Sequence, residues 1–203
     1  MIKKIEIGLF GTNAYVLVCE ETGEGVLIDA PGEAGKISEQ SKGVSVKYIL
    51  LTHSHMDHTG ALVELKFRWN VPVAGHELDS SGLPVPADIL LSDGNTVSFG
   101  NVMLEVLHTP GHTSGSLCFL FGDHLFSGDT LFPHGPGRTN TPSDFKTIVD
   151  SLEKKIFVLS DEVHVYPGHG EETVLKREKD EFQVFSSRPH SPGLYGNVMW
   201  LES

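Results

Sequence analysis

The chain has 203 residues, of which 39% are hydrophobic and 21% are charged. This length and composition predict a single α/β domain spanning residues 1–203. The formal net charge of -12 argues against nucleic acids and anionic membranes as partners, because an acidic surface repels both. We expect a cytoplasmic protein with a small-molecule substrate, since no apolar run resembles a membrane span or an export signal. The sequence leaves the oligomeric state open.

Strand and helix patterns follow one another through the first half of the chain. Apolar runs predict four strands, at residues 2–9, 14–19, 25–29 and 47–52. A short helix is predicted at residues 33–41, after a Pro-Gly break. A second helix is predicted at residues 61–69, where Leu62, Leu65 and Trp69 share one face.

The second half shows a similar succession of predicted strands and helices with a different sequence. Glycine-containing turns indicate hairpins at residues 97–107 and 116–126. Thr141 is a suitable cap for a helix whose apolar stripe is Phe145, Ile148, Val149, Leu152 and Ile156. A strand at 163–166, a helix at 173–185 and an irregular tail at 188–203 complete the chain. Together these elements predict two mixed sheets packed face to face between helices, a four-layer αββα arrangement.

Eleven histidines are present, and one cluster of them has the spacing of a metal site. Residues 52–60 read Thr-His-Ser-His-Met-Asp-His-Thr-Gly, directly after a buried strand. Imidazole and carboxylate suit zinc and related divalent ions. Residues two apart in an extended segment point the same way, so His53 and His55 can hold one ion. Asp57 and His58, where the chain turns into a helix, can reach a second. The competing interpretation is a loop of solvated histidines.

Three more ligand-type residues follow strands and have glycine neighbours: His112, Asp129 and His169. Glycine permits close approach of the backbone, so these positions suit ligands of the same centre. The remaining histidines lack this arrangement. His134 is the exception, because it lies in a loop soon after Asp129, and we assign it to the mouth of the pocket. Cys19 and Cys118 lie in apolar runs and are expected to be buried, reduced thiols.

These motifs resemble the signature of the metallo-β-lactamase superfamily, and the match runs from about Ile5 to Glu178. Within it, residues 111–115 (GHTSG), 128–132 (GDTLF) and Gly137-Arg138 resemble glyoxalase II-like, or hydroxyacylglutathione hydrolase-like, enzymes. The resemblance implies the αββα fold and two divalent metal ions, with zinc expected and iron or manganese open. It also implies three groups of ligands: His53, His55 and His112 for the first metal; Asp57, His58 and His169 for the second; Asp129 bridging both.

The implied reaction is hydrolysis of a thioester or activated ester by a hydroxide held between the two metals. Asp57 and Asp129 would offset the charge of the ions and orient the hydroxide. Arg138 is assigned to a carboxylate on the substrate, with a surface salt bridge as the alternative interpretation. The thiolate product leaves without protonation, which favours a thioester.

Some features separate the chain from individual branches of the superfamily. Only 34 residues, 170–203, follow His169, too few for the extra helical segment of true glyoxalase II enzymes, so a glutathione thioester is not assumed. An aspartate at position 129 and no signal peptide disfavour antibiotic hydrolysis. A mononuclear iron persulfide dioxygenase is the main alternative, since such enzymes share these motifs. A lactonase and a non-catalytic protein of the same fold are further alternatives.

Overall fold

The computed structural model describes all 203 residues and contains two six-stranded sheets. The first has the order β1-β2-β3-β4-β5-β6, with bounds Ile2–Ile7, Thr12–Val18, Glu24–Ile28, Ser45–Leu50, Val73–His76 and Ile89–Leu91. The second has the order β14-β13-β10-β9-β8-β7, with bounds Thr173–Val174, His164–Pro167, His124–Gly128, Leu117–Phe121, Val102–His108 and Thr96–Phe99. Both are mixed, because β3 to β6 run parallel in the first and β10 and β13 run parallel in the second.

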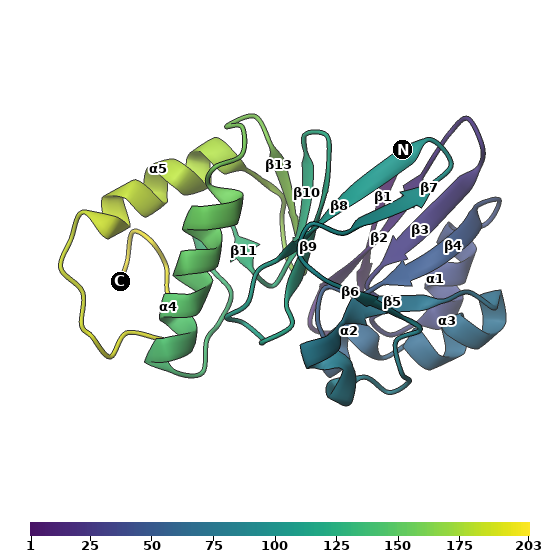
Figure 1. Cartoon of the computed structure of the whole chain (residues 1–203), viewed down its shortest axis with the longest axis horizontal. Coiled ribbons are helices and arrows are strands. Elements are labelled where there is room, and N and C mark those ends of the chain that lie inside the picture. The colour runs from purple at the N-terminus through teal and green to yellow at the C-terminus, as the bar shows by residue number, and fades with distance from the viewer.

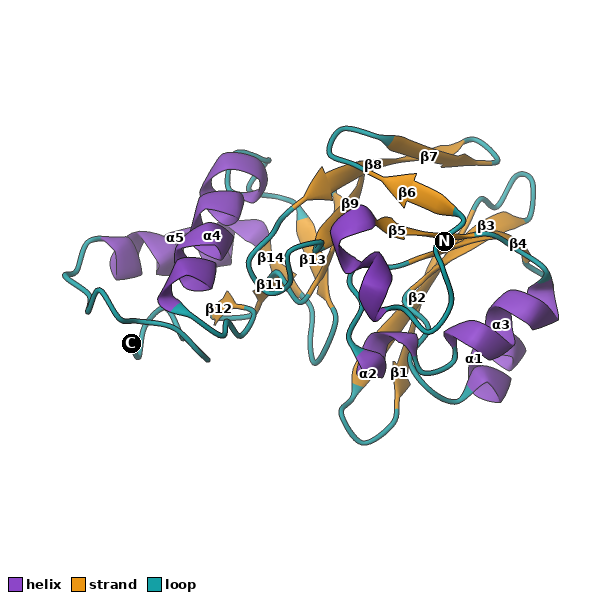
Figure 2. Cartoon of the chain, turned by 60° about the horizontal axis from the view of Figure 1, so that its bottom comes forward, coloured by secondary structure: helices purple, strands orange, loops and turns teal.

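Helices cover the outer face of each sheet (Figures 1 and 2). Beside the first sheet lie α1 (Ala34–Gln40), α2 (Met56–Thr59) and α3 (Leu62–Trp69), with a 3-10 turn η1 (Glu77–Gly82) after β5. Beside the second lie α4 (Pro142–Ser151), its π-helical continuation η2 (Leu152–Ile156) and α5 (Leu175–Ser186). A short hairpin of β11 (Leu131–Phe132) and β12 (Gly135–Pro136) lies between β10 and α4 in the sequence.

The buried side chains form three apolar layers that separate these four layers of secondary structure. Strand β2 is buried along its whole length, and its alternate side chains point into two different apolar layers. Ala14 and Val16 face the layer that holds Ile37 of α1 and Leu62 of α3. Tyr15 and Leu17 face the layer between the sheets, with Leu104, Val106, Leu117, Phe119 and Phe126 of the second sheet. The third layer joins the second sheet to α4, η2 and α5. The predicted αββα fold is confirmed.

Several short elements and one helix boundary differ from the sequence prediction, among them β5, β6 and the β11–β12 hairpin. Strands β5 and β6 were not predicted, because each has only three or four residues and forms by parallel pairing at the edge of the first sheet. The predicted helix at 173–185 begins at Leu175, because Thr173 pairs with Val165 of β13 instead. In both places tertiary pairing overrides local propensity.

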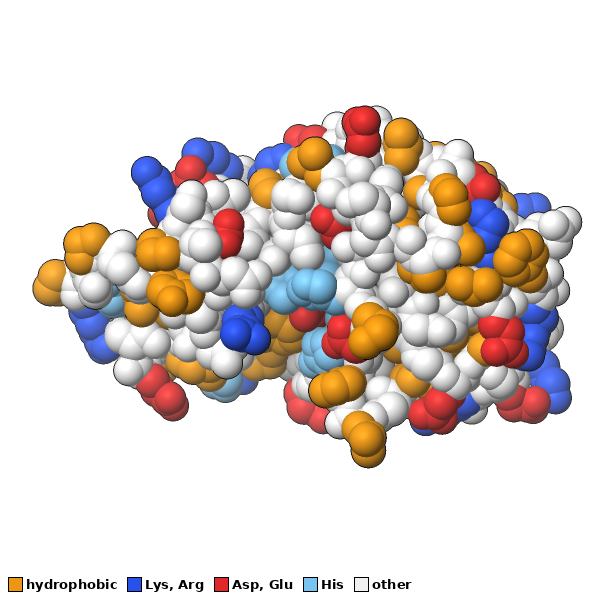
Figure 3. Space-filling view, turned by 90° about the horizontal axis from the view of Figure 1, so that it is seen from below, with side chains coloured by type: hydrophobic (Ala, Val, Ile, Leu, Met, Phe, Trp, Pro, Cys, Tyr) orange, Lys and Arg blue, Asp and Glu red, His pale blue; other side chains and the backbone are white.

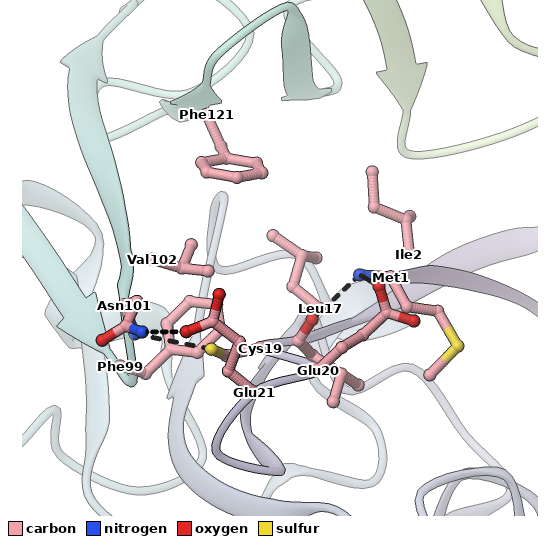
Figure 4. A pocket seen from close by; sticks show the side chains of 11 residues that line it. Met1, Ile2, Leu17, Cys19, Glu20, Glu21, Phe99, Asn101, Val102 and Phe121 are labelled. Carbon is pink, nitrogen blue, oxygen red and sulfur yellow. Dashed lines mark hydrogen bonds and ion pairs between the residues drawn. The ribbon is translucent and has the colours of Figure 1, made fainter.

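Both cysteines are buried and free, as expected. Cys19 lies in the wall of an apolar cavity of about 300 Å³ between β2 and the strands β7 to β9 (Figure 4). That cavity is at the far end of β2 from Thr12, the residue that bridges to His169. It is therefore remote from the predicted ligands. No helix of the chain has both the length and the apolar character needed to cross a membrane.

The tail at 188–203 has no regular structure, yet it is anchored by Trp200. The Trp200 side chain is completely buried, with its ring edge-on to Phe182 at 5.1 Å between centroids and 5.0 Å from the ring of Phe185. The backbone N–H of Trp200 donates to the carbonyl oxygen of His134 at 2.8 Å. The tail thus packs on α5 and on the β11–β12 turn of its own chain.

We expect Trp200→Ala to lower the free energy of unfolding by about 3–5 kcal/mol, because a large aromatic side chain leaves a cavity. Leu201→Ala is the matched control, since its side chain is 48% exposed, and it should change stability by less than about 0.5 kcal/mol. Urea denaturation followed by fluorescence at a second tryptophan, Trp69, and by circular dichroism measures both. Equal stability of the two variants would contradict the anchoring role of Trp200.

Candidate metal centre

The predicted ligands lie together because the strands that precede them end at the same edge. In the second sheet, β8, β10 and β13 run in one direction, so the loops with His112, Asp129 and His169 meet. Strand β4 of the first sheet ends at this edge too, because the Thr52 carbonyl after it accepts from the N–H of Leu117 in β9, and His53 follows. Thr12 of β2 bridges to His169, and the N–H of Asn13 donates to the Gly168 carbonyl, which joins the two sheets at this edge.

Three imidazole nitrogens converge on one point. His53 Nε2 lies 3.0 Å from His55 Nδ1, and His112 Nε2 lies 2.9 Å from the same atom. Two ligand atoms of a tetrahedral zinc ion, each about 2.0–2.1 Å from it, are roughly 3.3 Å apart. The three nitrogens therefore have close to the spacing that one ion requires.

A second set of donors lies beside the first. His58 Nε2 is 3.1 Å from His169 Nε2, and Asp57 Oδ2 is 3.3 Å from His169 Nε2 and 4.0 Å from His58 Nε2. Helix α2 explains the placement of Asp57 and His58, because the chain turns into this helix one residue after His55. The set combines two imidazoles with one carboxylate, which suits a divalent ion.

Asp129 lies between the two sets. Its Oδ1 is 3.3 Å from His58 Nε2, and its Oδ2 is 3.5 Å from His112 Nε2 and 3.6 Å from His169 Nε2. Oδ1 is also a buried oxygen with no hydrogen-bond donor in the protein. A buried, unpartnered carboxylate oxygen is costly, and a cation would satisfy it. The donor set thus fits two divalent ions with Asp129 between them.

The outer nitrogens of the histidines make contacts that fix their tautomers. The Nδ1–H groups of His112 and His169 donate to the carbonyl oxygens of Arg138 at 2.8 Å and Phe10 at 3.0 Å. Because a carbonyl can only accept, Nε2 of each ring is left with a free lone pair toward the centre. Such contacts orient ligand imidazoles in metal sites generally.

A buried aspartate that the sequence analysis did not single out, Asp29, orients two more ligands. Its Oδ2 accepts from His58 Nδ1 at 2.8 Å and from the Thr52 hydroxyl at 2.8 Å, and its Oδ1 accepts from the Thr52 N–H at 2.8 Å. The Thr52 oxygen then lies 3.0 Å from Nδ1 of His53. Asp29 has a positive φ of 57° at the end of β3. Its place directly after a strand was the one local signal.

A second buried aspartate, Asp79 in η1, holds the loops around the first ligand set. Its carboxylate accepts from the N–H groups of Ser54 and Gly115, each at 2.8 Å, and from the Thr113 hydroxyl at 3.0 Å. These contacts tie the loop carrying His53 and His55 to the loop carrying His112. No local motif predicts this role, because Asp79 is distant in sequence from both loops.

Burial and neighbouring charges shift the pKa values within the centre in opposite directions. Burial, with the neighbouring His58, holds the pKa of His53 well below its usual range. Burial also opposes protonation of His58, but the carboxylates of Asp29 and Asp129 outweigh it and raise its pKa to about 10. Burial raises the pKa of Asp129, yet the nearby His58 and the surrounding imidazoles bring it below the usual range. An ion that binds here would therefore displace a proton from His58.

The two residues assigned to the substrate have different surroundings. Arg138 is exposed and lines a cavity shared with His112 and Asp129. The His134 ring instead lies 3.0 Å from the carboxylate of Glu181 and contacts Arg177, both on α5. The sequence assignment of His134 to the pocket mouth is not supported, because α5 supplies it with charged partners that local sequence does not reveal. Figure 3, which shows the molecule from below, has histidine and acidic side chains gathered in a hollow of the surface.

The geometry agrees with comparisons with known proteins. The model of the Metallo-beta-lactamase superfamily matches residues 7–169, so the chain belongs to this superfamily. It is 33% identical over 201 residues to the "Probable metallo-hydrolase YqgX" of Bacillus subtilis, with 88% of this chain and 94% of the relative covered. It is 30% identical over 210 residues to "Hydroxyacylglutathione hydrolase GloC" of Haemophilus influenzae, with 92% and 99% covered.

Solved structures with the same fold are equally similar in sequence. The BLEG-1 B3 metallo-beta-lactamase has a TM-score of 0.81 at 33% identity, with 89% of this chain and 97% of that chain covered. ETHE1 from Myxococcus xanthus has a TM-score of 0.79 at 32% identity, with 88% and 81% covered. TTHA1623 in a di-iron-bound form has a TM-score of 0.75 at 32% identity, with 87% and 96% covered.

We expect Asp29→Asn to weaken metal binding about 10- to 100-fold, the usual effect of losing an outer contact to a ligand. An amide that donates to His58 Nδ1 favours the tautomer with its proton on Nε2, the atom that faces the centre. Asp123→Asn, in the exposed turn between β9 and β10, is the control. Competition with a chromogenic chelator measures both affinities. Equal affinity of Asp29→Asn and the parent protein would show that Asp29 does not set the tautomer.

A second prediction concerns Gly168, where an added Cβ would lie 2.2 Å from Asp129 Oδ1 and 2.7 Å from His58 Cε1. Gly168→Ala should displace both donors, reduce metal content and destabilise the protein by about 1–3 kcal/mol. Gly35→Ala in α1 is the control, because a Cβ there meets nothing within 4 Å. Metal analysis and thermal unfolding provide the two measurements. Full metal content in Gly168→Ala would contradict the close approach.

Proposed function

We propose that the protein is a binuclear metallohydrolase that cleaves a thioester or activated ester of a small molecule. The observation that carries this proposal is the position of Asp129 between two converging sets of donors, with one of its oxygens buried and unpartnered. A centre of this kind suits hydrolysis. Similarity to a hydroxyacylglutathione hydrolase and to a probable metallo-hydrolase along most of the chain supports the same reaction class.

Two bound divalent ions would supply a water of lowered pKa and a Lewis acid for the carbonyl oxygen. The histidines would hold the ions as neutral ligands, because His112 and His169 keep their protons on the outer nitrogens. Asp57 and Asp129 would offset part of the cationic charge. The overall reaction adds one water across the C–S bond and yields a carboxylic acid and a thiol. Since a thiolate leaves readily, no protein acid is needed at the leaving sulfur.

The metal is proposed to be zinc, with iron or manganese as alternatives. Histidine nitrogens and carboxylate oxygens, with no cysteine among them, are compatible with all three ions. The similarity to TTHA1623, solved in a di-iron-bound form, supports iron as a serious alternative.

A second candidate is a mononuclear iron persulfide dioxygenase. His53, His112 and Asp129 offer two imidazoles and one carboxylate, with His112 Nε2 3.5 Å from Asp129 Oδ2, which is the ligand set of non-haem iron oxygen chemistry. In this case the second set, Asp57, His58 and His169, would be left without an ion. The two-metal hydrolase is favoured because the chain is similar along most of its length to a probable metallo-hydrolase and to a hydroxyacylglutathione hydrolase.

Metal content per chain of the protein as purified, measured by plasma mass spectrometry, separates the candidates. About two ions per chain with hydrolysis of thioesters supports the proposal. One iron per chain with oxygen consumption on a persulfide would replace it with the dioxygenase. The substrate panel should include lactones and a β-lactam, since one similar structure is a B3 metallo-beta-lactamase. Hydrolysis of the β-lactam alone would contradict the thioester assignment.

We expect Asp129→Asn to lower kcat/KM for the best thioester by more than about 100-fold. This is more than the loss expected when a residue that only contacts a metal ligand is replaced. The amide keeps the size of the side chain but loses the charge that joins the two donor sets. Asp123→Asn should retain full activity, because Asp123 is exposed at a hairpin turn. Unchanged activity in Asp129→Asn would exclude the two-metal mechanism.

A further inference from the structure

The C-terminal tail contributes one wall of a cavity that opens onto the metal centre. This cavity has a volume of about 300 Å³ and is reached from the sides of His112 and Asp129. Asn197, Val198 and Met199 of the tail line it beside the β11–β12 hairpin. The tail is far in sequence from the other lining residues, so the sequence patterns gave no sign of its position.

This wall is fixed by backbone contacts on both sides of Asn197. Before it, the N–H of Thr139 donates to the Gly196 carbonyl at 3.2 Å, and the Gly196 N–H donates to the Thr139 hydroxyl at 3.2 Å. After it, Trp200 is buried and bonded to the His134 carbonyl. A Cβ on Gly135 would lie 2.4 Å from the Val198 carbonyl oxygen, so tail and hairpin are in direct backbone contact. Residues 196–199 are therefore held in place by contacts on both sides and form a fixed wall of the cavity.

Two polar side chains of this cavity, those of Arg138 and Asn197, have no partner within the chain. Arg138 is exposed, and its guanidinium makes neither a hydrogen bond nor an ion pair, although the chain has 27 acidic residues. The Asn197 side chain is likewise exposed and unbonded. The only acidic residue in the lining is Asp129, which belongs to the metal centre. Guanidinium and amide donors beside apolar walls of proline, phenylalanine and valine suit a short chain that ends in a carboxylate.

A second space opens from the other side of His112 and has different chemistry. It measures about 580 Å³, lies between His55 and α4, and contains the carboxylate of Asp144. A carboxylate there would meet a like charge, while a larger neutral group such as the thiol portion of a thioester would not. Size and charge therefore assign the smaller space to the acyl group and the larger to the leaving group.

We propose that residues 196–199 and Arg138 form an acyl pocket that selects thioesters of short dicarboxylic acids, with Asn197 as a specificity-determining residue. This proposal rests on the thioester hydrolase function. The free carboxylate of the acyl group binds Arg138 and Asn197, and the scissile carbonyl then lies toward His112 and Asp129. The tail takes part in substrate binding as well as in stability.

The test compares succinyl and butyryl thioesters of N-acetylcysteamine, which share the thiol and the chain length. We expect kcat/KM to favour the succinyl substrate. Arg138→Gln should reduce this preference about 10- to 100-fold, the range for a hydrogen bond between charged groups. Asn197→Ala should reduce it about three- to tenfold. The preference is the ratio of the two kcat/KM values of one variant, so any effect that a substitution has on both substrates cancels. Arg188→Gln, which removes an exposed charge outside the cavity, is the control and should keep the preference.

Three outcomes distinguish failure of this inference from failure of the proposed function. If butyryl and succinyl thioesters are hydrolysed equally and Arg138→Gln changes neither, the acyl pocket is wrong while the hydrolase stands. If a carboxylate on the thiol rather than on the acyl group improves turnover, the assignment of the two spaces is wrong. If no thioester is hydrolysed, the proposed function fails first. Ligand-observed NMR of succinate with the metal-free protein adds a readout without turnover, and weaker binding to Arg138→Gln is the expected result.

Discussion

The carboxylate of Asp29 is the contact on which the metal centre depends. It is buried at the end of β3 and accepts three hydrogen bonds, from the N–H and hydroxyl of Thr52 and from Nδ1 of His58. These donors replace the water that a buried charge loses. Through His58 it orients one ligand set, and through Thr52 and His53 it orients the other. A single buried charge between β3 and β4 thus orients histidine side chains in both ligand sets.

The residues that converge in the candidate metal centre were easier to identify from the sequence than the contacts that hold them. His53, His112 and Asp129 were recognisable because their side-chain chemistry and their place after strands are local features. Asp29 and Asp79 were not, because each acts on loops 23 to 36 residues away, and only the fold shows that they meet. The layers were likewise predictable from alternation within strands, whereas β5 and β6 depend on pairing with a neighbouring strand.

The electrostatics of the centre and of the whole chain favour cations in different ways. The net charge of -12 produces a long-range field that attracts divalent ions and is screened by salt. Within the centre, burial keeps His53 neutral and ready to donate a lone pair, and the same burial leaves Asp129 with an unpartnered oxygen. Arg138 is the exception to the acidic surroundings, and it lies where a substrate would approach rather than where a metal would bind.

The ligands come from four loops and from both sheets, so the centre exists only when the two sheets are packed together. An ion that binds it binds the native state and not the unfolded chain. By mass action, free metal at 100 times its dissociation constant would add about 2.7 kcal/mol to the free energy of unfolding. That is a large share of the roughly 5–15 kcal/mol that holds a typical domain together. The supply of metal in the cell would therefore govern how long the folded chain persists, as well as whether it is active.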